Sequence, residues 1–468
     1  MKKIYYCNIL LLIIIVFFSR SSLGKSESEI VNIRISKRTV INDYFYGFGV
    51  ETLPWLWTNE NKEAGVSDED IKLNFSRIEE MELPITRIFI PWETWDPNLD
   101  YKTFTWDSDE MKSLCKTLDF YQRTGTKVIL VTVDWLKISP WSNAELSAGA
   151  VLNLLEYLVK VKDYSCIQFW TLTNEPELTY AWLKKMPFEN YVLVHRLIKD
   201  GLKRKKIPIR IIGSDDVESK DWFKESVRSL YGIVDIFSSH LYLYPQDVPQ
   251  IPVYFQERLD IIKRASFAKK DIPFFVCEFG FRGDDFGAYN NSLMGSYEYG
   301  LYTASLCVDA LNLGVAGCSI WCLHQIRLID EIYPEGDKMM RIGLWAYKDK
   351  NWQPFPIYYL YRLFTKYIKS SSRVLKTKTF PSNILKAACV EYKGKYSLFI
   401  TNPTNMEQNF LVEWEGLDSY FRKYIYSKFQ LSLAQENLLM IDGQVMVKNG
   451  LKDKIPASSV ILYTNLKE

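Results

Sequence analysis

Two glutamates each stand at the end of an apolar run with the length of a buried strand. Glu175 follows the run 167–174 and precedes a proline, and Glu278 ends the run 273–278. Two carboxyl groups on one cleft can hydrolyse a glycosidic bond, because one protonates the leaving oxygen while the other attacks the anomeric carbon. Their mutual repulsion separates their pKa values and can assign the two roles. The simpler alternative is that both glutamates form structural salt bridges.

Other side chains that bind or stack on sugars also lie at the ends of apolar runs. Carboxylates and aromatic rings together suit a carbohydrate ligand. The candidates for substrate binding are Glu51, Arg87, Asp134, Trp135, Asn174, His240, Tyr242 and Trp321. Asp215 and Asp216 are weaker candidates of the same kind. A buried structural role is the alternative for His240, and packing at the rim is the alternative for Trp321. We expect only one of His240 and Tyr242 to point inward, and we favour Tyr242.

The elements that must position these residues alternate between short apolar runs and helical patterns. The eight runs are 46–52, 86–91, 127–135, 167–174, 209–214, 235–240, 273–278 and 315–321, and helices are expected at 68–81, 109–124, 153–161, 187–203, 255–267 and 297–313. Eight strand–helix units over about 320 residues predict a (β/α)8 barrel, a TIM barrel, within residues 41–369. In this fold, residues at the carboxyl ends of the strands face the active site. An open doubly wound sheet is disfavoured, because the first run lacks a glycine-rich phosphate turn.

The chain changes character after residue 369. Residues 370–468 contain strand-like runs separated by Gly, Asn and Asp, without a long helical period. This pattern predicts a C-terminal antiparallel β-sandwich domain. Within residues 25–40, the alternating segment 30–35 is a candidate additional strand of that sandwich. The sandwich is either a sugar-binding module or a structural support, and we favour support because it lacks an obvious row of exposed tryptophans.

Residues 1–24 have the pattern of a secretory signal peptide. Two lysines precede the apolar run 9–18, and small residues follow it. We therefore expect a secreted or periplasmic protein, with an uncleaved anchor as the alternative. No second long apolar stretch occurs, so we expect no membrane span after signal removal.

Composition restricts the partners. The formal net charge is +2 over 468 residues, and the first 24 residues contain three basic residues and no acid. The remaining chain is close to neutral, which argues against nucleic acid as a partner. Seven cysteines lie outside the signal peptide, so at least one is free and one disulfide is possible. Cysteines and histidines do not occur at zinc spacing, so we expect no metal. We also expect no cofactor. The expected partner is a carbohydrate substrate, and the expected oligomeric state is a monomer.

The motif Asn174-Glu175-Pro176, with Glu278 three apolar runs later, resembles the clan A glycoside hydrolases. The resemblance covers about residues 40–369. It implies that Glu175 is the general acid/base and Glu278 the nucleophile. It also implies that Arg87 and Tyr242 contact the nucleophile, that Asn174 binds the sugar 2-hydroxyl, and that Trp321 stacks under the sugar.

This resemblance implies a retaining enzyme that cleaves β-glycosidic bonds of an oligo- or polysaccharide through a covalent glycosyl-enzyme. The alternative is a non-catalytic glycan-binding protein on the same scaffold. The segment 47–57 matches no single family, so the family within the clan is not assigned.

Overall fold

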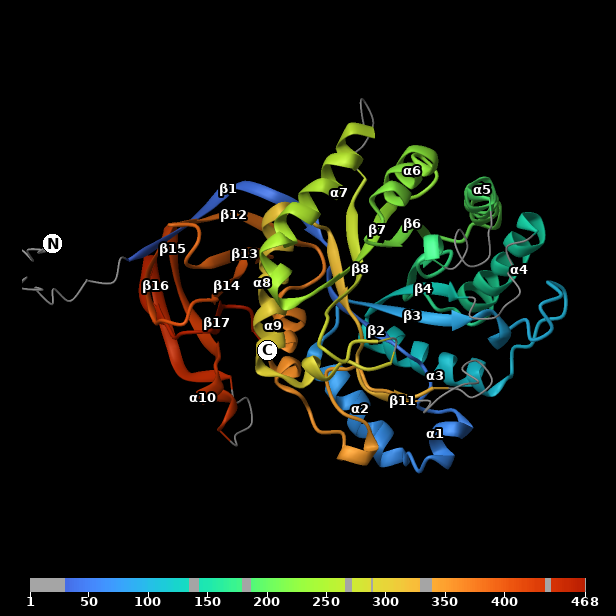
Figure 1. Ribbon diagram of the computed structural model, residues 1–468, viewed down its shortest axis with the longest axis horizontal. Helices are drawn as coiled ribbons and strands as arrows, with labels where there is room; N and C mark the ends of the chain where they lie inside the picture. The colour runs from blue at the N-terminus through green and yellow to red at the C-terminus, as the bar shows by residue number, and fades with distance from the viewer. Residues whose placement is uncertain are drawn as a thin grey trace, which may run out of the picture.

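The computed structural model describes residues 30–133, 143–178, 187–265, 272–287, 289–328, 339–433 and 439–467. Figure 1 shows two parts side by side, a barrel surrounded by helices and a β domain drawn mainly in orange and red. The predicted fold class is confirmed, because eight parallel strands form a closed barrel and a separate, largely antiparallel sheet follows it.

The barrel strands follow the order of the sequence. They are β2 (Gly47–Thr52), β3 (Ile85–Pro91), β4 (Lys127–Val133), β5 (Ile167–Thr171), β6 (Arg210–Val217), β7 (Ile236–Leu243), β8 (Phe274–Phe281) and β9 (Gly317–Ile320). The last strand pairs with the first in parallel, which closes the barrel. A short hairpin, β10 (Ile326–Arg327) with β11 (Met339–Met340), follows β9. All carboxyl ends therefore open at one end of the barrel.

Helices surround the barrel. They are α1 (Asn59–Glu63), α2 (Asp68–Met81), α3 (Asp109–Thr124), α4 (Ala144–Glu156), α5 (Phe188–Lys205), α6 (Lys220–Leu230), α7 (Ile251–Ala265), α8 (Tyr297–Leu313) and α9 (Pro356–Tyr367). The bounds of α2 and α3 match the sequence prediction because local signals set them. Ser67 and Asp70 form a capping box at the start of α2, and Gly125 takes the left-handed conformation that ends α3. Helix α6 was not predicted.

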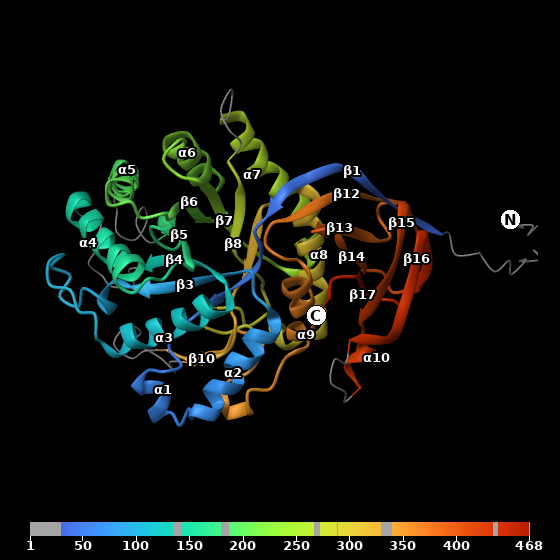
Figure 2. The same ribbon diagram turned by 180° about the vertical axis from the view of Figure 1, so that it is seen from behind.

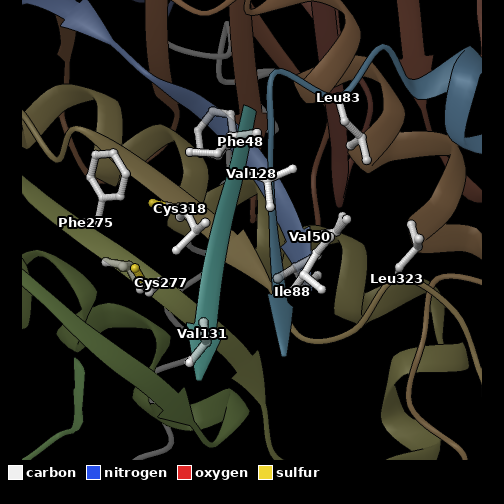
Figure 3. Packing of buried hydrophobic residues seen from close by; sticks show 14 of the residues in the cluster. Phe48, Val50, Leu83, Ile88, Val128, Val131, Phe275, Cys277, Cys318 and Leu323 are labelled. Carbon is white, nitrogen blue, oxygen red and sulfur yellow. The ribbon is translucent and has the colours of Figure 1, made fainter. Parts of the chain in front are cut away.

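Aliphatic and aromatic side chains and cysteines from neighbouring strands form the buried core of the barrel part. Figure 3 shows Val50 of β2, Ile88 of β3 and Val131 of β4 beside Cys277 and Cys318, all of them buried. These cysteines pack as small hydrophobic residues. The seven cysteines in the described part of the chain are free thiols, so the possible disulfide is not formed.

The second part is a seven-stranded sheet that closes on itself. Its strands are β1 (Val31–Phe45), β12 (Ser372–Phe380), β13 (Lys386–Tyr392), β14 (Lys395–Asn402), β15 (Gln408–Tyr426), β16 (Met440–Ile455) and β17 (Ser459–Thr464), with a short helix α10 (Lys428–Leu431) after β15. Strand β1 begins in this sheet, where it pairs antiparallel with β12 and parallel with β15. It then runs toward the barrel (Figure 2). Alternate residues Val31, Ile33 and Ile35 pack into the apolar core of the sheet.

The two parts share a continuous apolar contact. The ring of Phe399 in β14 stacks on Phe364 of α9 with ring centroids 4.1 Å apart, and Tyr426 stacks on Tyr297 of α8 at 4.7 Å. Both pairs belong to the core cluster that also fills the barrel. The sheet therefore packs against the barrel wall formed by α8 and α9. Among the helices of the described residues, none is long and apolar enough to cross a membrane.

Candidate active site

A cleft of about 380 Å³ opens at the carboxyl ends of the barrel strands. Glu175, four residues after the end of β5, and Glu278, within β8, both line it. The other lining residues are Phe89, Asn174, Val217, Tyr242, Arg282, Phe286, Gly287, Tyr289, Trp321, Met340 and Ile342. The fold thus brings the two glutamates singled out by sequence into one cleft.

The two carboxyl groups face one another. One carboxylate oxygen of Glu175, one of Glu278 and a ring nitrogen of His240 all lie within 4.8 Å of one another. The side chain of Glu278 is 7% exposed, and that of Glu175 is 20% exposed. The two carboxyl groups therefore have different environments, with Glu278 deeper and Glu175 nearer to solvent.

A buried guanidinium connects the strand ends beneath the cleft. Arg87 Nη1 donates to Glu51 Oε2 at 2.8 Å and to Glu278 Oε2 at 3.0 Å. Its Nη2 donates to Asn174 Oδ1 at 2.9 Å and to Asp215 Oδ2 at 2.7 Å. A fully buried charge is costly unless it is paired and hydrogen-bonded, and here the carboxylates provide that pairing. Arg87 therefore orients the carboxylate of Glu278 and the amide of Asn174 together.

Glu51 lies beneath the cleft rather than along it. Its side chain is fully buried and reaches the site through Arg87, which does not fit the expectation of a direct sugar contact. Burial raises the pKa of Glu51 to about 8, Arg87 opposes the rise, and the neighbouring Glu278 adds to it. Asp215 and Asp216 are also buried and do not line the cleft.

His240 and Tyr242 both point into the site. The Tyr242 hydroxyl donates to Glu278 Oε1, and His240 Nδ1 lies 3.0 Å from Glu175 Oε1. The expectation that only one would point inward is wrong, because residues two apart on a strand project from the same face. The preference for Tyr242 as the contact of Glu278 agrees with the geometry.

The charges around His240 favour its protonated form. Burial opposes the charge, but the carboxylates of Glu278 and Asp215 outweigh it and raise the pKa of His240 well above its ordinary value. Within the described residues, Glu175, His240 and Glu278 form a group whose possible metal-ligand atoms lie within 4.8 Å of one another, and an imidazolium would have to lose a proton before it could ligate a metal. Burial raises the pKa of Glu278 above its ordinary value, and His240 and Arg87 offset only part of this rise.

Unusual backbone geometry accompanies this site. Ser214, Asp215 and Glu175 have positive φ angles of 74°, 54° and 48°. The pairing of β6 with β7 shifts between Ser214 and Asp216, as in a β-bulge. Each left-handed non-glycine residue costs about 1–3 kcal/mol, and such residues concentrate at functional sites. The bulge directs Asp215 to Arg87 and Asp216 to Arg258 on α7.

Aromatic and aliphatic side chains form the cleft wall. Trp321 lies 5.5 Å from the ring of Phe89 between centroids, and its peptide bond to Cys322 is cis. Phe286 and Tyr289, on the segment after β8, complete the wall with Met340. Sequence reasoning missed these three, because no periodic pattern marks a loop residue as part of a cleft. Asp134 and Trp135 lie outside the described residues.

No protein-family model matches the chain, and no curated protein matches its sequence significantly. Solved structures of low sequence identity share its fold. A GH30 endoxylanase from Clostridium papyrosolvens is 14% identical with a TM-score of 0.63, over 93% of this chain and 99% of its own. The GH51 α-L-arabinofuranosidase from Thermotoga petrophila is 12% identical with a TM-score of 0.66, over 93% and 100%. A conserved exported protein from Bacteroides fragilis is 11% identical with a TM-score of 0.66, over 92% and 99%.

Proposed function

We propose that this protein is a retaining glycoside hydrolase that cleaves β-glycosidic bonds of an oligo- or polysaccharide. The observation that carries the proposal is the close approach of Glu175 and Glu278, whose nearest paired oxygens lie within 4.8 Å at the cleft. Retaining enzymes hold their two carboxyl groups about 5–5.5 Å apart, whereas inverting enzymes leave room for a water at about 6.5–9.5 Å. Xylanases and arabinofuranosidases among the structural neighbours support the same reaction class.

In the first step, Glu278 attacks the anomeric carbon while Glu175 protonates the leaving oxygen. The bond from the anomeric carbon to that oxygen breaks, and an ester between the sugar and Glu278 forms. The donors Arg87 and Tyr242 hold the Glu278 carboxylate and favour its ionised form. The greater exposure of Glu175 suits a group that must meet the departing oxygen and then water.

In the second step, Glu175 accepts a proton from water, and that water attacks the anomeric carbon. The ester bond breaks, Glu278 leaves as a carboxylate, and the sugar departs with its original anomeric configuration. Asn174, held by Arg87, is placed to bond the 2-hydroxyl of the sugar, and Trp321 to stack against its ring. No cofactor takes part in this scheme.

We also propose that residues 1–24 direct export, so that the enzyme meets its carbohydrate substrate as a secreted or periplasmic monomer. In this proposal, residues 41–369 form the catalytic barrel, and residues 370–468, with a strand from 25–40, form its support. The contact of Phe399 with Phe364 between the two parts favours this division of roles.

The proposal is tested by substrate screening followed by NMR of the product. The panel contains aryl β-glycosides, xylan and other β-linked polysaccharides, and aryl α-L-arabinofuranosides, because one structural neighbour is an arabinofuranosidase. We expect hydrolysis of at least one substrate, with the first-formed hemiacetal retaining the configuration of the bond cleaved. An inverted first product contradicts the mechanism. If a glycan binds but no substrate of the panel is hydrolysed, the protein is a non-catalytic glycan-binding protein.

A further inference from the structure

Asp215 lies between the two groups that contact the proposed catalytic carboxylates. Its Oδ2 accepts from Arg87 Nη2 at 2.7 Å, and its Oδ1 lies 3.4 Å from His240 Nε2. Arg87 in turn donates to Glu278, and His240 contacts Glu175. Asp215 is therefore connected to Glu278 through Arg87 and to Glu175 through His240.

His240 is surrounded by carboxyl groups. Nδ1 lies 3.0 Å from Glu175 Oε1 and 3.9 Å from Glu278 Oε2, and Nε2 lies 3.4 Å from Asp215 Oδ1. A neutral imidazole could accept at Nδ1 while Glu175 carries its proton, but once Glu175 is ionised that lone pair would oppose a carboxylate. An imidazolium donates from both nitrogens and suits both directions.

Other contacts fix Asp215 as the anion of this group. Ser238 Oγ donates to Asp215 Oδ1 at 2.9 Å, and the backbone carbonyl of Asp215 accepts from the backbone N–H of Glu175 at 3.2 Å. The bulge in β6 directs the Asp215 side chain inward with a φ of 54°. Burial disfavours its charge, but Arg87 and then His240 lower the pKa of Asp215 below its ordinary value.

We propose that Asp215 is a positioning residue that keeps His240 as an imidazolium and holds it, together with Arg87, against the catalytic pair. This inference rests on the proposed function, in which a charged His240 stabilises Glu175 each time it gives up its proton. The groups that face His240 are Glu175, Asp215 and Glu278, and Asp216 lies one residue further along β6. Arg87 forms ion pairs with two of the carboxylates that face His240, those of Asp215 and Glu278.

Asp216 provides a matched control. It is equally buried and adjacent in sequence, but its Oδ1 accepts from Ser214 and Ser239 at 2.7 Å, and its Oδ2 lies 3.3 Å from Arg258 Nη2. The change from Asp216 to Asn removes one buried carboxylate without touching Arg87. Differences between D215N and D216N therefore report on the position of the charge rather than on its burial.

The test is an NMR titration of isotopically labelled histidine in the full chain, which contains three histidines. Burial lowers the pKa of His195 and of His324 to about 4, so these two are neutral in the neutral range. We expect one further histidine, absent from the H240Q spectrum, to remain protonated from pH 5 to beyond pH 8. In D215N its midpoint should fall by about 1–3 pH units, the usual effect of one nearby charge. In D216N, whose carboxylate interacts with His240 more weakly than Asp215 does, the midpoint should fall by less than in D215N.

A neutral His240 at pH 7 in the wild type overturns the inference, and so does an unchanged midpoint in folded D215N. If D215N does not fold, the wild-type titration still decides the inference, because a His240 midpoint below pH 7 contradicts it. In activity assays, D215N should lower kcat by at least tenfold, with KM little changed. The loss should not exceed the roughly 10²–10⁴-fold that acid–base catalysis contributes. The NMR result is readable even if the protein hydrolyses no glycoside, so the two proposals fail separately.

Discussion

The carboxyl end of the barrel and the seven-stranded sheet place their charged side chains very differently. At the barrel end, Arg87 is fully buried among three carboxylates, and residues there have left-handed backbone conformations. In the sheet, ion pairs keep more exposure to solvent: the side chains of Arg34 and Glu413 are 61% and 44% exposed, and those of Lys423 and Asp453 are 13% and 22% exposed. Buried charges are weak evidence for stability and are retained where they serve a function. The contrast is what we expect if, as proposed, the barrel end carries out the chemistry and the sheet supports it.

The largest effect on activity is expected for E278Q at the barrel end. This change removes the proposed nucleophile while keeping its shape, and turnover should fall by about 10⁴-fold or more, as for nucleophiles of other hydrolases. The amide oxygen can still accept from Arg87, and the amide NH2 can donate to the Tyr242 hydroxyl oxygen, so the fold should persist by circular dichroism. The matched change in the sheet, E413Q, should leave turnover unchanged. Wild-type turnover in E278Q would exclude Glu278 as the nucleophile.

The second largest effect is expected for R87M. Without the guanidinium, the carboxylates of Glu51, Asp215 and Glu278 remain buried near one another, which should cost roughly 3–5 kcal/mol of unfolding free energy. Urea unfolding followed by tryptophan fluorescence measures this loss. A loss below about 1 kcal/mol, the range of exposed pairs, would show that the group is not held by Arg87.

A smaller, pH-dependent effect is expected for E51Q. Glu51 has an ordinary pKa of 4.5 when unfolded and a pKa of about 8 in the folded chain. Between these values the folded state keeps the proton and the unfolded state releases it, so the wild type loses stability as pH rises from 4.5 to 8. The amide carries no such proton, and E51Q should gain stability relative to wild type across that window. Urea unfolding at pH 5 and pH 8 tests this, and parallel pH dependences would contradict a raised pKa.

The smallest effect is expected for R34A in the sheet. The Arg34 Nε to Glu413 Oε2 contact of 2.7 Å is exposed to solvent, so its loss should change the unfolding free energy by at most about 1 kcal/mol. The variant should also keep full activity. A loss comparable to that of R87M would remove the distinction between the two regions.

Sequence predicted the fold class and the residues at strand ends because both depend on short-range patterns. The apolar runs locate β5 and β8, and the glutamate that follows the first run and the glutamate that ends the second, Glu175 and Glu278, both line the cleft. Sequence did not reveal that Glu51 is buried, because depth along a barrel axis depends on the stagger of all strands. It also did not distinguish Asp215 from Asp216, since the bulge between them arises from pairing with β7.

The central claim is tested most directly by trapping the glycosyl-enzyme. The protein is incubated with an activated 2-deoxy-2-fluoro glycoside of the preferred sugar, digested, and examined by peptide mass spectrometry. Such a reagent forms the ester with the nucleophile and slows its hydrolysis. We predict one added sugar per chain, on the peptide containing Glu278, and none on E278Q. A label on Glu175, or turnover of the substrate without any covalent intermediate, would contradict the assignment of Glu278 as the nucleophile.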